Sequence, residues 1–465
     1  MPDLLLTHGY FLFEDPKELQ IMKPYAPLGI LYLCSHLESK GFSVEVFDTT
    51  FSSWQELCNR LRSETPSVLG VYANLMTRAN VIEILTVARE AGWTTIVGGP
   101  EPGAYIEEYL RNSADFVVFG EGELTLEELL GDLRSGNRSR LDHIAGIAYL
   151  DANGMVRQNP PRPQIANLDA QPWPARHAVD IPRYVKTWRD AHGTGSVNFI
   201  TARGCPYRCQ WCSHQVYGQT HRRRNPVLVV DEVQWLLETY SPDMMWISDD
   251  VFTIHHGWLR AYAAEMHRRG LCVPFECISR ADRLNEEMLN LLAGLGCFRV
   301  WIGSESGSQR ILDAMQRGVT TEQVENAVAL CRQRGIQSGM FLMWGYLGEE
   351  IEDIEATIRH VCATNPDIFF TTVSYPIKGT PYHRAVQDNL VHLQPWTKGS
   401  DREIRIRGRH SRQFYSYADK LLRAEAERSR AANGSAPSPV DFSAMQSEIA
   451  GLRESLVAAQ CEVEA

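Results

Sequence analysis

The first 140 residues alternate between short apolar runs and longer segments whose apolar positions recur at helical spacing. The short runs are rich in β-branched and aromatic residues and are bounded by Gly, Pro or Asp, which is typical of strands. Because runs that are apolar on both faces need cover on both sides, the pattern predicts a doubly wound, Rossmann-like parallel sheet. The predicted strands are residues 3–7, 43–47, 68–72, 95–97 and 115–119, and the predicted helices are residues 28–39, 54–62, 79–91 and 124–133.

The alternation resumes near residue 197, after a predicted hairpin and an irregular, proline-rich connector. Six strand–helix units predict a (β/α)6 partial TIM barrel, with its chemistry at the carboxyl ends of the strands. Beyond it, an amphipathic stretch at residues 445–457 either dimerises the protein or docks on it. We therefore predict an α/β protein with a first domain at 1–142, a hairpin and linker at 143–190, a barrel at 191–400 and a helical C-terminal region at 401–465.

Charge and composition narrow the class of protein. Acidic residues number 57 against 46 basic ones, and the net charge of −11 argues against a nucleic-acid partner. No cationic N-terminal segment and no apolar run of about 18 residues is present, so we expect a cytoplasmic enzyme without a membrane span. Eleven cysteines are too few for a disulfide scaffold in a chain of 465 residues.

Three of the cysteines lie close together in the sequence. Cys205, Cys209 and Cys212 have the spacing C-x3-C-x2-C, directly after the first predicted barrel strand. Three thiolates in one loop can converge on one metal centre, and a cubane cluster held by only three of them keeps one iron open for a ligand. The alternative is a structural zinc site with His214 or His221 as the fourth ligand.

The cysteine loop resembles the signature of the radical S-adenosylmethionine (SAM) superfamily, which has an aromatic residue just before the third cysteine. Trp211 occupies that position. The resemblance implies a [4Fe-4S] cluster on the three cysteines, with SAM bound to the open iron and cleaved to a 5′-deoxyadenosyl radical. It also implies SAM contacts near the ends of the later strands, although Leu347 replaces a frequent proline. The implied SAM-binding residues are Trp211, Asp249, Asp250, Arg280, Glu305, Ser306 and Gly345.

The first domain resembles the cobalamin (B12)-binding domain found upstream of such cores, on the segments 97–101 and 115–123 and the five-strand pattern. The alternative is a Rossmann-like domain that is empty or binds a nucleotide, although no G-x-G-x-x-G follows the first strand. Ligands of doubly wound sheets lie beyond the carboxyl ends of the strands. The implied cobalamin-binding residues are Thr7, Tyr72, Asn74, Leu75, Met76, Gly98, Gly99, Gly120, Glu121, Gly122 and Glu123.

Several tempting motifs have a plainer interpretation. Residues 190–195 fit D-x-H-x-x-G, which supplies a cobalt-binding histidine elsewhere, but they follow the connector rather than the first strand, so we interpret the match as coincidence. The lower face of cobalt would then meet the 74–78 loop without a histidine, which favours methyl transfer. His255 and His256 are interpreted as the start of a surface helix. Two roles are open for the run of three arginines, Arg222, Arg223 and Arg224. The run either contacts an anionic substrate or cobalamin, or it forms a solvated loop.

Two reactions remain open, and a third is disfavoured. The first is methylation of an unactivated carbon of a small-molecule, natural-product or peptide-derived substrate through methylcobalamin. The second is oxidative cyclisation or ring remodelling without net methylation, as in magnesium-protoporphyrin ester cyclases. An RNA-modifying methylthiotransferase is disfavoured, since only Cys34 and Cys58 precede the core. No catalytic side chain is assigned beyond the cofactors, and the resemblance implies an external electron donor of the flavodoxin or ferredoxin type.

Overall fold

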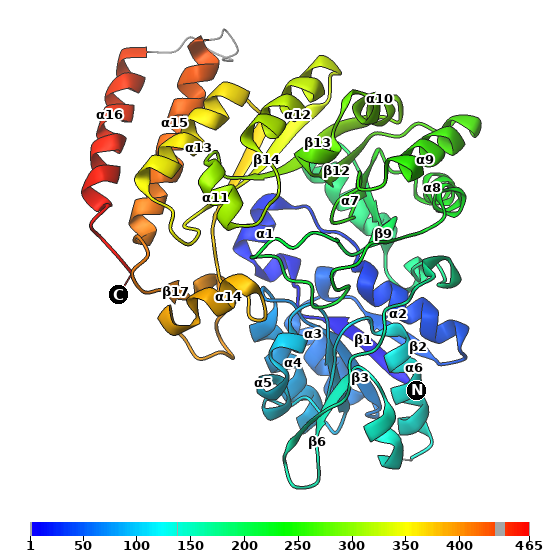
Figure 1. Cartoon of the computed structure of the whole chain (residues 1–465). Helices are drawn as coiled ribbons and strands as arrows, with labels where there is room; N and C mark the ends of the chain where they lie inside the picture. The colour runs from blue at the N-terminus through cyan, green and yellow to red at the C-terminus, as the bar shows by residue number, and fades with distance from the viewer. Residues whose placement is uncertain (1, 137, 433–441, 465) are drawn as a thin grey trace. The chain divides into compact units, whose positions relative to one another are not determined.

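The computed structural model describes residues 2–136, 138–432 and 442–464 (Figure 1). The chain forms two compact units, and each contains segments that are distant in sequence. One unit comprises Met1–Pro206, Ser213–Trp246 and Gln394–Asp401. The other comprises Tyr207–Cys212, Ile247–Leu393 and Arg402–Ala465.

A seven-stranded sheet forms the centre of the first unit, in the order β2-β1-β3-β4-β5-β6-β7. Strands β1 to β5 pair in parallel, whereas β6 and β7 form an antiparallel hairpin at one edge. All five strands predicted for this sheet and the predicted hairpin are therefore present. The strands are β1 (Leu4–His8), β2 (Val44–Phe47), β3 (Val68–Tyr72), β4 (Thr94–Gly98), β5 (Phe116–Val118), β6 (Ile147–Leu150) and β7 (Val156–Gln158).

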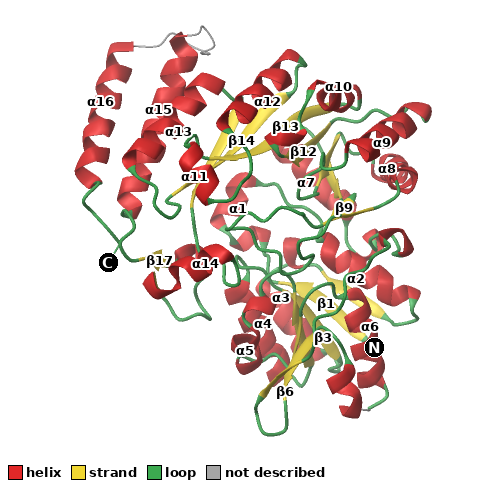
Figure 2. Ribbon diagram, viewed as in Figure 1, coloured by secondary structure: helices red, strands yellow, loops and turns green. Residues whose placement is uncertain are grey.

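Helices cover both faces of this sheet (Figure 2). Successive side chains of each strand point to opposite sides, so every strand contributes side chains to both covered faces. In β1, Leu5 packs with α3, α4 and α5, whereas Leu4 and Leu6 pack with α2 and α6. This two-sided burial confirms the doubly wound sheet. The helices are α2 (Leu28–Ser39), α3 (Trp54–Ser63), α4 (Arg78–Glu90), α5 (Ile106–Arg111) and α6 (Glu123–Arg134).

The connector after the hairpin contains a helix that was not predicted. Helix α7 (Ile181–His192) lies across the predicted boundary at residue 190 and buries Tyr184, Val185 and Trp188. Their spacing is helical, but the prolines around them pointed to an irregular segment. The remaining elements of this unit are α1 (Pro16–Ile21), β8 (Ser196–Phe199), β9 (Ala202–Arg203), β10 (Arg222–Arg223), α8 (Pro226–Tyr240) and β11 (Met244–Ile247).

Four parallel strands form the centre of the second unit, in the order β15-β14-β13-β12. Together with β8 and β11, they account for all six strands predicted for the barrel. Strand β13 is the longest of these four strands and ends with Ser304 and Glu305. The elements are α9 (His256–Arg268), β12 (Phe275–Ser279), α10 (Glu286–Gly294), β13 (Cys297–Glu305), α11 (Gln309–Ala314), α12 (Thr321–Gln333), β14 (Gln337–Trp344), α13 (Ile351–Thr364) and β15 (Ile368–Val373).

The C-terminal helices belong to the second unit. Helices α15 (Arg412–Ala432) and α16 (Phe442–Ala459) pack beside α13, and Ile449 and Leu456 of α16 are buried with Leu421 of α15 (Figure 1). The amphipathic stretch therefore docks on its own chain. Helix α14 (Pro381–Val386) and the short strands β16 (Leu390–Val391) and β17 (Arg405–Ile406) precede these helices. In the described ranges, no helix is both long enough and apolar enough to span a bilayer.

Candidate functional site

A two-stranded hairpin frames the loop that carries the cysteines. Strands β9 and β10 pair Arg203 with Arg222. Gly204 follows with φ of +86°, and a Cβ there would lie 2.3 Å from the carbonyl oxygen of Thr220. Only glycine therefore allows this close approach of the two ends of the loop. Cys205 comes next and is half-buried.

Cys209 and Cys212 share a thiol hydrogen bond, and this bond lowers the pKa of Cys209 to about 5. The nearby charges of Arg317 and Arg280 act in the same direction, and burial opposes them. The same hydrogen bond, together with burial, raises the pKa of Cys212 well above its usual value. Arg317 Nη1 lies 3.6 Å from Cys209 Sγ. A thiolate is the form that binds iron, so these residues fit a cluster.

Backbone contacts hold the cysteine loop against the second unit's own elements. The amide of Gln210 donates to Met315 O at 3.0 Å, and the amide of Tyr382 donates to Gln210 O at 2.9 Å. Trp211 packs against a group of buried apolar side chains that includes Met315, Tyr382 and Tyr346. Among the described residues, no three Cys, His, Asp or Glu side chains are grouped as a metal-binding set.

Sequence reasoning missed two residues of this neighbourhood. Arg317 follows α11 in an ordinary-looking turn, and no sequence signal distinguishes it from a surface arginine. Tyr207 lies between the first two cysteines, and the Arg280 guanidinium stacks 3.6 Å from its ring centroid. Arg280 also donates to the carbonyl oxygens of Arg317 and Gly318, so this predicted SAM contact holds the turn that carries Arg317.

The last residue of β13, Glu305, has a backbone conformation that is rare for a residue with a side chain. Its φ is +62° and its carboxylate is buried, which raises its pKa to about 7 despite Arg317 at 3.7 Å. The neighbouring Ser306 hydroxyl contacts Thr357 at 3.2 Å and accepts from the Ser308 amide. Strain of this kind persists where the surrounding packing enforces it and is common at ligand sites.

Gly345, at the end of β14, has φ of +70° and packs against the Tyr415 ring. Its amide donates to Glu349 Oε2 at 2.5 Å, and burial raises the pKa of Glu349 to about 8. After β11, Asp249 is buried and Asp250 is exposed. The SAM-binding role of Glu305, Ser306, Gly345 and these aspartates stays a prediction.

The carboxyl ends of β3, β4 and β5 form the edge predicted to bind cobalamin. Gly99 has φ of +120°, and a Cβ there would lie 2.4 Å from the Ala73 carbonyl oxygen. Asn74 Oδ1 accepts from the amide of Met76, whose side chain is 60% exposed. Gly120 has φ of +80° with open space beside it. These features fit a large ligand that approaches backbone closely.

Other predicted cobalamin contacts already have partners within the protein. The Thr7 hydroxyl donates to Phe47 O at 2.8 Å. Tyr72 and Gly98 end their strands side by side in the register of β3 and β4. Leu75 is half-buried in the turn after β3, and Gly122 is the N-cap of α6, where a Cβ would lie 3.0 Å from Leu33.

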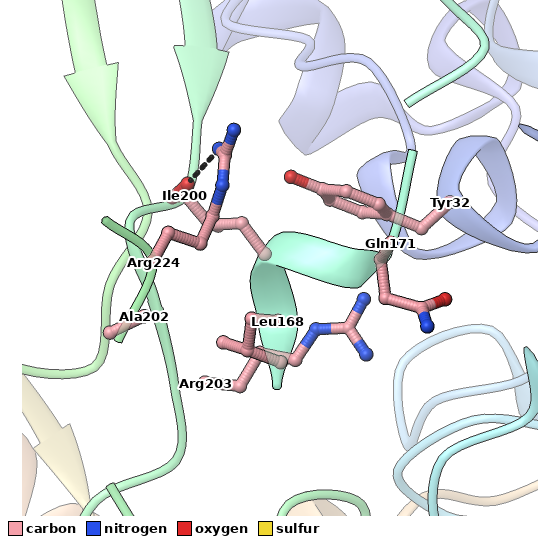
Figure 3. Close-up of a pocket in the computed structure, with 7 residues that line it drawn as sticks. All are labelled: Tyr32, Leu168, Gln171, Ile200, Ala202, Arg203 and Arg224. Atoms are coloured by element: carbon pink, nitrogen blue, oxygen red, sulfur yellow. Dashed lines mark hydrogen bonds between the residues drawn. The ribbon is translucent and has the colours of Figure 1, made fainter. Parts of the chain in front are cut away.

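The arginines of residues 222–224 are not a solvated loop, so that alternative is wrong. Arg222 donates to Glu121 at 2.6 Å, and Arg224 pairs with the fully buried Glu232. Figure 3 shows Arg224 and Arg203 beside Tyr32 around a small pocket at the start of the cysteine loop, with Arg224 also bonded to Ile200 O at 3.0 Å. Charges enclosed in this way need paired partners, which Glu121 gives to Arg222 and Glu232 gives to Arg224.

The histidines have structural partners. His192 ends α7 and donates to Ile21 O at 2.9 Å, in keeping with a coincidental motif match. His255 caps α9 by accepting from the Trp258 amide, so the predicted helix start is confirmed. His8, the last residue of β1, contacts Asp48 through Nε2 at 3.0 Å.

Comparison with known families identifies two domains along the chain. Residues 21–130 match the B12 binding domain, and residues 199–361 match the radical SAM superfamily. The chain therefore combines the two domains that define cobalamin-dependent radical SAM enzymes, which confirms the resemblance and the implied cofactors, SAM, a [4Fe-4S] cluster and cobalamin.

Curated relatives and a solved structure are similar to most of this chain. The uncharacterized methyltransferase PH0819 of Pyrococcus horikoshii is 29% identical over 384 residues, which cover 80% of this chain and 81% of that protein. The anaerobic magnesium-protoporphyrin IX monomethyl ester cyclase of Rubrivivax gelatinosus is 26% identical, over 75% of this chain but only 64% of the relative. The methyltransferase TsrM from Kitasatospora setae, solved with cobalamin and a [4Fe-4S] cluster, has the same fold (TM-score 0.72, 19% identity, covering 98% of this chain and 100% of TsrM).

Proposed function

We propose that the protein is a radical SAM C-methyltransferase that uses cobalamin to methylate an unactivated carbon of a small-molecule, natural-product or peptide-derived substrate. The observation that carries the proposal is the three-cysteine loop in which the Cys209 and Cys212 thiols meet beside Arg317, in a chain that also matches the B12 binding domain. The named activity of the Pyrococcus relative supports methyl transfer as the reaction.

The proposal assigns Cys205, Cys209 and Cys212 to the cluster. When bound, the cluster, SAM and cobalamin supply a radical initiator and a methyl carrier. Arg317 balances the negative charge of the thiolates from the buried side. The Gly345 turn and the stacked Tyr346 and Tyr382 rings exclude water from the adjacent end of β14. No side-chain base is assigned.

The test is anaerobic reconstitution with iron, sulfide and cobalamin, then incubation with SAM and a low-potential reductant. We expect both 5′-deoxyadenosine and S-adenosylhomocysteine, with cobalamin retained. If neither product forms and a Cys205→Ala variant still binds one zinc ion, the structural zinc alternative replaces the proposal. The Cys205→Ala protein should otherwise lose its iron and both products.

Cyclisation or ring remodelling is the second candidate, favoured by the similarity to the Rubrivivax cyclase. Formation of 5′-deoxyadenosine without S-adenosylhomocysteine in the same assay would select it. For either reaction we propose a cytoplasmic location, no nucleic-acid partner and an external flavodoxin- or ferredoxin-type electron donor. The domain limits at residues 142, 190 and 400 are likewise proposals.

A further inference from the structure

Two acidic residues at the end of β5 face the base of the cysteine loop. Glu121 lies in the turn that leads into α6 and Glu123 is the first residue of that helix, both within the match to the B12 binding domain. Both were expected to contact cobalamin, yet both carboxylates point to arginines of the hairpin β9–β10 instead. Arg203 Nη1 donates to Glu121 at 2.8 Å, and Arg203 Nη2 donates to Glu123 at 2.7 Å.

Glu121 is the centre of this cluster. Its second oxygen accepts from Arg222 at 2.6 Å and from the backbone amide of Ile165 at 2.7 Å. Glu121 is 6% exposed and Arg203 is 3% exposed, so the pairs are shielded from solvent and salt. One carboxylate thereby joins the turn after β5, the connector at Ile165 and both strands of the hairpin.

The hairpin controls the ends of the cysteine loop. Arg203 precedes Gly204 and Cys205 directly, and Arg222 lies directly across from Arg203 in the hairpin register. Only Gly204 separates Arg203 from Cys205, and a Cβ at Gly204 would lie 2.3 Å from the Thr220 carbonyl oxygen, so the backbone of residues 203–205 lies close against the other end of the loop. Because Glu121 pairs with Arg203 and Arg222, a displacement of the turn after β5 also displaces these two arginines.

We infer that Glu121 is a positioning residue that couples cobalamin binding at the turn after β5 to the order of the cysteine loop. The inference rests on the proposed function, since it needs cobalamin to bind at this edge of the sheet. By linkage, the coupling acts in both directions, so a formed cluster also favours cobalamin binding.

The test compares hydrogen exchange of residues 204–221 with and without saturating hydroxocobalamin in the full chain. We expect cobalamin to slow exchange in the wild type by about tenfold, within the usual range of coupling between sites. In Glu121→Gln the same saturation should give little protection. The matched control is Glu128→Gln on α6, which removes the charge of an ion pair with Arg162 at a side chain that is 49% exposed and should behave like the wild type.

A spectroscopic measurement adds a second readout. After reconstitution, SAM should perturb the electron paramagnetic resonance signal of the reduced cluster in the wild type and in Glu128→Gln, and much less in Glu121→Gln. If Glu121→Gln fails to fold, Arg222→Leu removes the outer contact, and we expect the same losses. Wild-type protection in either variant overturns the inference and leaves the proposed function intact. A wild type that binds no cobalamin overturns both.

Discussion

At the scale of single residues, the cysteine loop depends on a guanidinium that lies more than a hundred positions further along the chain. Arg317 lies against Cys209, donates to the carbonyl oxygen of Gly303 at 3.0 Å and pairs with Glu305. A buried cation with these partners stabilises the thiolate and holds the ends of two elements together. Its removal would leave Glu305 and the thiolate without their compensating charge.

We therefore expect Arg317→Met to lose iron. After anaerobic reconstitution it should retain less than about half of the four irons of a cubane cluster. Arg359→Met, which breaks only an exposed ion pair with Glu355, is the control and should match the wild type. Full iron content in Arg317→Met would show that the guanidinium does not support the cluster. Iron per chain is the measurement.

Gly99 gives a second prediction at this scale. In Gly99→Ala the new Cβ meets the Ala73 carbonyl at φ of +120°, so we expect the free energy of unfolding to fall by about 2–3 kcal/mol. Gly131→Ala, in the middle of α6 with open space around it, should instead stabilise the protein by about 0.5–1 kcal/mol. Urea denaturation measures both, and equal effects would contradict the steric argument.

At the scale of elements, the turn after β14 shows how a strand end is held by a buried acid. Glu349 accepts from the Gly345 amide, and its other carboxylate oxygen has no hydrogen-bond partner among the residues that the structure describes. Tyr415 of α15 closes the turn from the other side. Burial raises the pKa of Glu349 to about 8, so the acid is protonated in the folded protein at neutral pH.

This pKa predicts a pH dependence of stability. Between the unfolded pKa near 4.5 and the folded pKa near 8, the folded state binds the extra proton, so Glu349 destabilises the fold as pH rises through that window. In the wild type, this titration lowers the free energy of unfolding by at most about 1.4 kcal/mol for each pH unit. We expect Glu349→Gln to lack this decrease. Urea midpoints at pH 5.5 and 8 give the comparison. Parallel midpoints for variant and wild type would place the acid's pKa near its ordinary value.

At the scale of the whole molecule, segments distant in sequence complete each other's cores. Residues 394–401 pack within the first unit, where Arg78 pairs with Asp401 at 2.6 Å and also with Glu101. The Tyr105 hydroxyl donates to Asp401, and Trp396 packs on the ring of Tyr105. A buried arginine between two carboxylates is stable only while both are in place.

Breaking this contact should release the segment. Asp401→Asn removes the charge that faces Arg78, and we expect the free energy of unfolding to drop by about 2–4 kcal/mol. Limited trypsin digestion should then cut faster at Lys398 and Arg402. Asp388→Asn, at an exposed position before β16, is the control and should be digested like the wild type. Unchanged digestion of Asp401→Asn would show that Trp396 alone suffices to dock the segment.

The sequence by itself determined the order of strands and helices, the two parallel sheets and the cofactor class. Periodicity reports local burial, and three cysteines at close spacing report a metal centre before any folding is considered. It did not reveal α7, because prolines precede that helix, and it did not reveal the arginine partners of Glu121 and Glu123, because acidic loop residues carry no sign of their partner.

Only the tertiary structure decided which charged residues meet. The deciding contacts join positions 82 to 323 residues apart: Arg203 and Arg222 with Glu121, Arg317 with Cys209, and Arg78 with Asp401. An arginine has the same sequence appearance on a surface and in a core. Its role follows from the carboxylates or thiolates that the fold encloses with it, since burial makes unpaired charge costly.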